Sequence, residues 1–294
     1  MDNIDKGINS ILAVAEECYG IKVDPDDAQR LHLQLCKKYG SLNAQIIKNA
    51  FLSGEAAGFL TVNETYFFRE SAHFFLLRDY LHSLGEGGRG GRGAAGGIRI
   101  CCAAVASGCE AYSIAMLLND FNKNCEKPVP FHIDAFDINR QALEIASKGL
   151  YSERALREDG SCFHYMAAPF LKKIEGGYRP EYLADASIRK NISFFAHNLM
   201  DELPGKDYDV IFFRNAFIYI TAKNRPRILS NLHAALKEGG LLITGVSETA
   251  AVASAIAAAI ASAACLPGLE GKNKGDVFYF QKNTSLSSAD GGFV

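Results

Sequence analysis

The chain has 294 residues, of which 48% are hydrophobic and 22% are charged, and this suits one large globular unit or two domains with a buried core. Its formal net charge of −2 argues against a nucleic-acid-binding protein and against attraction to anionic membranes. No apolar run approaches the roughly 20 residues of a membrane span, and the first residues lack a signal-peptide pattern, so we expect a cytoplasmic protein without membrane insertion.

The segment 1–84 is predicted to be a small helical domain followed by a connecting helix. Apolar side chains recur at helical spacing from residue 8 to 15, the acidic residues 24–27 are typical of the start of a second helix, and residues 42–59 give a third periodic piece. The first 60 residues contain eight acids and six bases, so this domain is not basic.

Polar side chains interrupt an aromatic stretch at residues 60–70, just before the connecting helix. Asn63 and Thr65 are explained equally well as helix caps and as site residues. Arg69 follows two phenylalanines, and an arginine there must either extend to solvent or meet an anion.

Residues 85–97 contain eight glycines among thirteen residues. Such a stretch forms neither helix nor strand for long, and its backbone entropy favours a flexible linker. Its Arg-Gly pairs resemble nucleic-acid-binding tails, but with only two arginines a plain linker is the better interpretation.

Residues 98–118 predict a strand, a tight loop and a helix, the first unit of a doubly wound α/β domain that binds its ligand at the strand ends. The loop has one glycine, Gly108, and therefore neither the dinucleotide nor the phosphate-loop pattern. It also carries an acid, Glu110, which disfavours a phosphate. S-adenosylmethionine, which has no phosphate and carries a cationic sulfonium, suits the loop better, although a turn without a ligand remains an alternative.

A second strand at residues 131–139 contains Asp137 near its end. An acid at the tip of the second strand is typical of ribose recognition in nucleotide-binding folds. The alternative is that Asp137 caps the helix predicted at 140–148. The stretch 150–192 is mixed in character and predicts a small sub-domain inserted in the sheet.

The sheet pattern resumes at residues 192–196, which precede His197, Asn198 and Leu199. A buried strand at 210–213 then ends in Arg214 and Asn215, and polar residues at the end of a strand indicate a site more often than scaffold. The remaining predictions are a helix at 223–236, a turn at 237–240, a strand at 241–245, an alanine-rich packed helix at 250–264, a final or edge strand at 276–281 and a disordered tail at 283–294.

The eight cysteines form no Cys-x-x-Cys pair and lie mostly in apolar runs. Buried, reduced thiols are expected, and the pattern does not indicate a metal site.

Taken in order, these pieces resemble the CheR-type chemotaxis methyltransferases. The resemblance spans roughly residues 60–248, and each signature is modest alone but specific in this order. The signatures are Asn63-Glu-Thr-Tyr-Phe-Phe-Arg-Glu70, Ala106-Ser-Gly-Cys-Glu-Ala-Tyr-Ser113, Asp137-Ile-Asn139, Asn198-Leu199, Arg214-Asn-Ala-Phe-Ile-Tyr219 and, more weakly, Gly245-Val-Ser-Glu248.

The resemblance implies an S-adenosylmethionine-dependent methyltransferase domain at 98–282 that methylates glutamate side chains in the cytoplasmic domain of chemoreceptors. It implies Arg69 and Tyr219 as the residues closest to the chemistry. The implied cofactor-binding residues are Asn63, Thr65, Arg69, Gly108, Glu110, Asp137, Asn198, Leu199, Arg214 and Asn215.

Two departures from the family pattern stand out. Cys109 replaces the first of two loop glutamates and Ala111 replaces a proline, while Glu110 is retained. The N-terminal domain also lacks the arginine-rich helix that meets acidic receptors in the family. These departures leave two alternatives open: a cofactor-binding sensor or scaffold without catalysis, and a methyltransferase for another acceptor.

Overall fold

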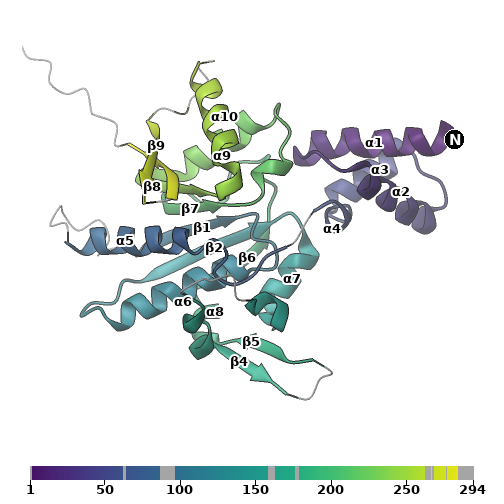
Figure 1. Cartoon of the computed structure of the whole chain (residues 1–294). Coiled ribbons are helices and arrows are strands. Elements are labelled where there is room, and N and C mark those ends of the chain that lie inside the picture. Colours follow the sequence, from purple (N-terminus) through teal and green to yellow (C-terminus); the bar gives the residue numbers. More distant parts are fainter. Residues whose placement is uncertain are drawn as a thin grey trace, which may run out of the picture.

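The computed structural model describes residues 2–61, 64–86, 97–157, 163–175, 179–261, 266, 268–275 and 277–283. Four helices at the N-terminus pack around a core of their own and lie beside a larger α/β unit (Figure 1). They are α1 (Asp2–Tyr19), α2 (Pro25–Tyr39), α3 (Ala44–Leu52) and α4 (Ala57–Leu60). The helix predicted at 42–59 is thus divided in two, because Gly54 between α3 and α4 has a φ of +82°, which an α-helix does not admit.

A seven-stranded sheet forms the centre of the larger unit, with the strand order β6-β2-β1-β7-β8-β10-β9. The strands are β1 (Ile98–Ala103), β2 (Phe131–Asp137), β6 (Ile192–Ala196), β7 (Tyr208–Phe213), β8 (Leu236–Thr244), β9 (Leu269–Lys274) and β10 (Val277–Lys282). The strands from β6 to β8 run parallel, and β10 runs antiparallel to β8 and β9. The chain winds from β1 through β2 to β6 and then returns to β7 on the other side of β1, which confirms the doubly wound α/β prediction.

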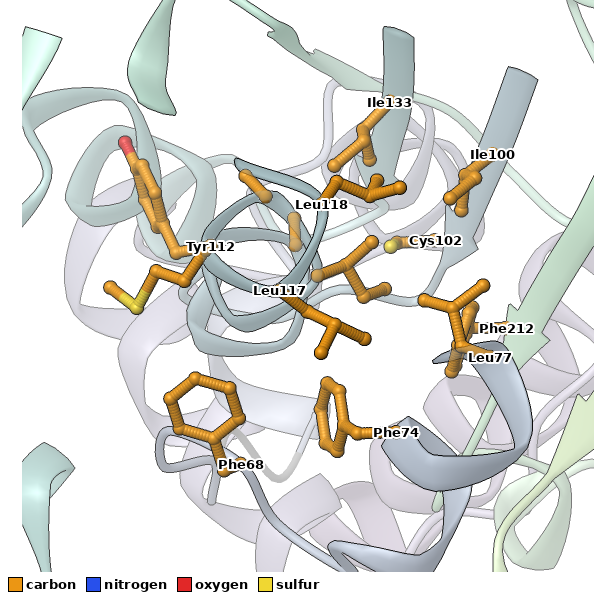
Figure 2. Packing of buried hydrophobic residues seen from close by; sticks show 14 of the residues in the cluster. Phe68, Phe74, Leu77, Ile100, Cys102, Tyr112, Leu117, Leu118, Ile133 and Phe212 are labelled. Carbon is orange, nitrogen blue, oxygen red and sulfur yellow. The ribbon is translucent and has the colours of Figure 1, made fainter. Parts of the chain in front are cut away.

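Helices cover both faces of this sheet (Figure 1). Alternate strand residues face the two layers: Ile100 packs beside the helices of one face, whereas Cys101 belongs to the core on the other face. Figure 2 shows Leu117 of the central helix among Phe74, Leu77 and strand side chains. The helices of this first face are α5 (Ala72–Glu86), α6 (Cys109–Lys123) and α7 (Arg140–Lys148), and those of the second are α9 (Arg225–Ala235) and α10 (Thr249–Ala261).

The inserted stretch between α7 and β6 carries a second, three-stranded antiparallel sheet in the order β3-β5-β4. Figure 1 shows β4 and β5 extending away from the main sheet. The elements of this stretch are β3 (Leu150–Ser152), η1 (Glu153–Leu156), η2 (His164–Met166), η3 (Ala168–Phe170), β4 (Leu171–Ile174), β5 (Glu181–Ala184) and α8 (Ala186–Arg189).

One prediction near the C-terminus is wrong in detail. The turn predicted at 237–240 lies inside β8, whose start is irregular because the register with β7 shifts there and Gly239 has a φ of +79°. The strand predicted at 276–281 as a final or edge strand is β10, the last strand of the described chain, and it lies inside the sheet because β9 is the edge strand. The charged sequence 269–274 does not indicate β9. Most of the expected linker and tail, residues 87–96 and 284–294, lies outside the described residues.

The alanine-rich helix α10 packs on the sheet, as predicted. Its side chains Val252 and Ile256 are buried in the same core as the inner face of α9. In the part of the chain that the structure describes, no helix combines the length and apolarity needed to cross a membrane.

Candidate active site

A cavity opens where the strand order reverses, at the carboxyl ends of β1 and β7. The N-terminal part of the chain supplies the facing wall through Tyr19, Ile21 and residues between Leu60 and Arg69. The sheet side of the lining comes from the ends of four strands, at residues 104–106, 137–138, 197–199 and 214–216.

Arg214, the first residue after β7, has a buried guanidinium that two carboxylates share. Its Nη1 donates to Oε2 of Glu110 at 2.7 Å, and its Nη2 donates to Oε2 of Glu70 at 3.2 Å and to the backbone carbonyl of Arg69 at 2.5 Å. Burial raises the pKa of the Glu110 carboxyl, and the Arg214 charge opposes this rise. Burial also acts on Glu70, but Arg214 and the Asn215 amide together hold its pKa below the usual value. The buried guanidinium of Arg214 thus compensates the charge of both half-buried acids.

A further buried carboxylate, Glu248, holds the loop that follows β7. Its Oε2 accepts a hydrogen bond from the backbone N–H of Asn215 at 2.7 Å, and its Oε1 accepts one from the backbone N–H of Ile218 at 3.2 Å. Glu70 binds the same loop, because its Oε1 accepts from the side-chain amide of Asn215 at 3.1 Å. The two carboxylates therefore fix the loop that leads into η4 (Phe217–Tyr219) and to Tyr219.

Asp137 ends β2 and lines the cavity. Its Oδ2 accepts from the backbone N–H of Ala106 at 2.8 Å, and its Oδ1 accepts from the backbone N–H of Asn139 at 2.8 Å. Burial raises the pKa of this carboxyl in spite of these donors. Each oxygen of a carboxylate has room for a second donor, so Asp137 can also accept from a pair of ligand hydroxyls.

Gly108 serves the fold at the start of α6. Its φ is +89°, and a Cβ there would lie 2.8 Å from Cβ of Ala146 and 3.1 Å from the hydroxyl of Tyr151. The departures Cys109 and Ala111 are fully buried and do not belong to the cavity lining. The altered loop positions therefore face the protein interior.

Strained backbone surrounds the cavity. Left-handed conformations cost about 1–2 kcal/mol for residues with a Cβ, and they gather at ligand sites because the surrounding structure enforces them. In the described part of the chain, all the non-glycine residues with positive φ except Asp207 lie around the cavity. They are Phe68 (φ +57°), Glu70 (+56°), Ala104 (+61°), Ala106 (+51°) and Asn215 (+57°).

The end of α1 is bonded to the strand-end loops. The side-chain amide of Asn198 donates to the backbone carbonyl of Cys18 at 2.7 Å, and the backbone N–H of Lys22 donates to the carbonyl of Tyr219 at 2.7 Å. These bonds hold the N-terminal helices against the cavity, which they help to enclose.

The structure brings most of the predicted site residues together. Gly108 is not part of the lining, and Asn63 lies outside the described residues. The predicted residues that line the cavity are Thr65, Arg69, Glu110, Asp137, Asn198, Leu199, Arg214, Asn215 and Tyr219.

Three features of the cavity were not predicted as site features. Glu70 and Glu248 each end a quoted signature and hold the loop after β7 through hydrogen bonds with Asn215, without lining the cavity themselves. Tyr19 and Ile21 line the cavity from the N-terminal part, and no local pattern in the sequence marks them. His197 also lines it, with a buried Nε2 that has no hydrogen-bond partner in the described structure.

The lining fits S-adenosylmethionine. The Nε of Arg214 is buried and unpartnered among the described residues, so it remains available to an anionic group such as the cofactor carboxylate. Asp137 suits ribose hydroxyls, and Ile138 and Leu199 give apolar walls for a flat ring.

The reversed strand order, the acid that ends β2 and a cavity suited to a phosphate-free nucleoside define an S-adenosylmethionine-dependent methyltransferase. Solved structures of such enzymes also align with the chain. One is a TehB-like methyltransferase from Corynebacterium glutamicum, with 15% identity, 73% of this chain and 100% of that chain covered, and a TM-score of 0.37. That superposition is too loose to carry an argument.

The chain belongs to the CheR methyltransferase family. Residues 63–262 match the family described as "CheR methyltransferase, SAM binding domain". A probable chemotaxis protein methyltransferase of Rhizobium etli is 36% identical, with 66% of this chain and 70% of the relative covered. Chemotaxis protein methyltransferases of Borreliella burgdorferi (33% identical, 65% of each chain) and Pseudomonas putida (29% identical, 82% of this chain and 81% of the relative) are also similar.

Proposed function

We propose that this chain transfers a methyl group from S-adenosylmethionine to the side-chain carboxylate of glutamate residues in chemoreceptors, forming glutamyl methyl esters in chemotaxis adaptation. The main support is that Arg69 and Tyr219, a cation and a phenol, line the same cavity as Glu110 and Asp137. The names of the similar chemotaxis methyltransferases support the same activity.

In the proposed binding mode, Asp137 accepts hydrogen bonds from the two ribose hydroxyls. Asn198 and Leu199 hold the adenine by an edge contact and a packing face. The Nε of Arg214 meets the cofactor carboxylate, and Glu110 faces its ammonium or sulfonium. Thr65, Asn215, Gly108 and Asn63 complete the proposed set of cofactor-binding residues.

The proposed chemistry asks for alignment more than for a strong base. When bound, the cofactor supplies an electrophilic methyl group on its sulfonium. The acceptor glutamate is already ionised at neutral pH, since its reference pKa is about 4.3. Arg69 and Tyr219 would hold that carboxylate in line, and such alignment requires the reacting atoms to be about 3–3.5 Å apart.

The proposed partner is the cytoplasmic domain of a chemoreceptor, which would place the reaction in the cytoplasm. Its docking does not depend on a basic N-terminal domain, because the first 60 residues carry more acids than bases. Two alternatives are distinguished by the test below. One is a cofactor-binding scaffold without catalysis, and the other is a methyltransferase for another acceptor.

The proposal is tested with a purified cytoplasmic receptor fragment and methyl-labelled S-adenosylmethionine. Fragments with glutamate at the acceptor sites should gain label, and matched fragments with glutamine at those sites should gain none. Label that persists in the glutamine fragments would identify another acceptor. Cofactor binding without label on any fragment would support the scaffold.

A further inference from the structure

Two exposed apolar side chains lie beside the cavity. Ile218 is 50% exposed and Val246 is 64% exposed, although they come from different loops, one after β7 and the other after β8. Single exposed hydrophobic residues are ordinary, so their exposure alone decides nothing. Their setting makes them notable, because both loops are bonded to the carboxylates that organise the site.

One carboxylate joins the two loops. Oε1 of Glu248 accepts from the backbone N–H of Ile218 at 3.2 Å, and Oε2 accepts from the backbone N–H of Gly245, the neighbour of Val246, at 3.2 Å. The two backbones therefore bind opposite oxygens of one buried group. We call Ile218 and Val246 together the apolar rim.

A second carboxylate ties the rim to the reacting end of the cavity. Oε2 of Glu70 accepts from the backbone N–H of Val246 at 3.3 Å and from Nη2 of Arg214 at 3.2 Å. Glu70 adjoins Arg69 in sequence, and Ile218 adjoins Tyr219. The rim is thus held beside the two residues proposed to align the acceptor.

We propose that the apolar rim is the docking surface for the acceptor protein, and that its occupant is an amphipathic segment whose apolar side chains flank the acceptor glutamate. This inference rests on the proposed function. A protein carboxylate can reach Arg69 and Tyr219 only if the chain on either side of it passes the residues around the cavity, and the rim adjoins Tyr219 and is bonded to Glu70, the neighbour of Arg69. At the reacting end, Arg69 and Arg214 offset Glu70 and Glu110, and Glu64 of the lining pairs with Arg157. Asp137 is the remaining acid of the lining, and the cationic sulfonium would offset it, so an acceptor carboxylate can approach this end.

Hydrogen bonds to Glu248 and Glu70 hold both loop backbones of the rim before the acceptor arrives. Contacts that are preorganised in this way reduce the entropy cost of docking and so raise affinity. The rim therefore acts on acceptor recognition, and its side chains make no contact that cofactor binding requires in the proposed mode.

The test uses Ile218→Ser, Val246→Ser and the double variant in the full chain. Ile218→Leu and Val246→Ile are conservative rescue variants, and Ile145→Ser is the matched control, because Ile145 is 47% exposed on α7 and outside the cavity lining. The measurements are binding of the glutamate-bearing receptor fragment to the protein loaded with S-adenosylhomocysteine, the acceptor KM, and the Kd for S-adenosylhomocysteine by calorimetry.

Each serine variant should raise the fragment Kd and the acceptor KM by about fivefold or more, the effect of truncating an interface side chain that matters. The Kd for S-adenosylhomocysteine should stay within about twofold, and the rescue and control variants should behave as wild type. Wild-type binding of the fragment by the double variant would overturn the inference. So would dimerisation of the wild type that the double variant abolishes, because the rim would then bind a second copy of the chain.

The two proposals fail separately. If the wild type binds the fragment through the rim but transfers no methyl group, the docking inference stands and the proposed function fails. If the wild type methylates the fragment and the serine variants do so with unchanged KM, the docking inference fails and the proposed function stands. If the wild type neither binds nor methylates the fragment, both fail.

Discussion

Nη1 of Arg214 lies 2.7 Å from Oε2 of Glu110, and the two residues come from opposite sides of the point where the strand order reverses. Arg214 follows β7, whereas Glu110 lies in the first turn of α6, the helix that follows β1. A charge-assisted bond between them joins the two halves of the sheet at the cavity, and it orients the guanidinium so that its Nε is left without a partner among the described residues.

Removing the Arg214 charge should destabilise the protein strongly. In Arg214→Met, Glu110 and Glu70 both lose their buried cation, and breaking such a cluster costs about 3–5 kcal/mol. Urea denaturation monitored by circular dichroism measures the loss. The double variant Arg214→Met with Glu110→Gln should recover part of it, because one uncompensated acid is removed. If Arg214→Met unfolds at the same free energy as the wild type, Arg214 does not stabilise the fold by compensating Glu110 and Glu70.

His73 should make the protein sensitive to acid. Burial and the nearby Arg214 charge lower its pKa to about 3, against the opposing effect of Glu70, so the folded state keeps it neutral while the unfolded chain protonates it below about pH 6.5. Stability from this source is present above pH 6.5 and is lost as the pH falls towards 3, at up to about 1.4 kcal/mol per pH unit. The pKa of Glu70 is also lowered in the folded state. Protonation of this carboxylate at lower pH therefore reduces the free energy of unfolding further.

His73→Gln should therefore flatten the dependence of unfolding free energy on pH between 7 and 5. The matched control is His82→Gln, which changes an exposed histidine on the same helix, α5, and should keep the wild-type slope. Identical slopes for wild type and His73→Gln would contradict the neutral state of His73.

Gly108→Ala should lower stability by roughly 2 kcal/mol or more. The new Cβ adds left-handed strain of about 1–2 kcal/mol and also meets Cβ of Ala146 at 2.8 Å. Gly239→Ala isolates the first effect, because Gly239 has a φ of +79° but open space around it. Thermal unfolding should thus show a larger decrease in Tm for Gly108→Ala than for Gly239→Ala. A similar decrease for both would mean that the contact with Ala146 relaxes freely.

Arg69 and Tyr219 should matter for turnover more than for cofactor affinity. Replacing both, as Arg69→Gln with Tyr219→Phe, should lower kcat for receptor methylation by about 100-fold or more, because the acceptor carboxylate loses its alignment. Saturating cofactor keeps cofactor binding from limiting the rate. Unchanged turnover in the double variant would show that neither residue aligns the acceptor.

The strand ends were the most predictable part of the site. Asp137, Asn198 and Arg214 each follow a short apolar run, and parallel strands bring their carboxyl ends to one edge, so local sequence was enough to collect them. The resemblance added Tyr219, which no periodicity marks, and it gave a role near the chemistry to Arg69, which its position after two phenylalanines had already singled out.

The remaining features depend on contacts between distant parts of the chain. Tyr19 reaches the cavity because Asn198 binds the end of α1, a pairing across 180 positions that leaves no local pattern. Glu248 acts through the backbone of Asn215, so its side-chain type alone did not reveal its partners. Gly108 was predicted as a ligand contact, but its φ and its tight packing also give it a structural reason to be glycine.

The most direct test of the central claim is the chemical stability of the transferred methyl group. The protein is incubated with methyl-labelled S-adenosylmethionine and receptor-bearing membranes, and the labelled receptor is then treated with mild base. Glutamyl methyl esters should release the label as methanol, and heat-inactivated protein should give none. Label that appears on protein only in base-stable form would contradict glutamate methylation.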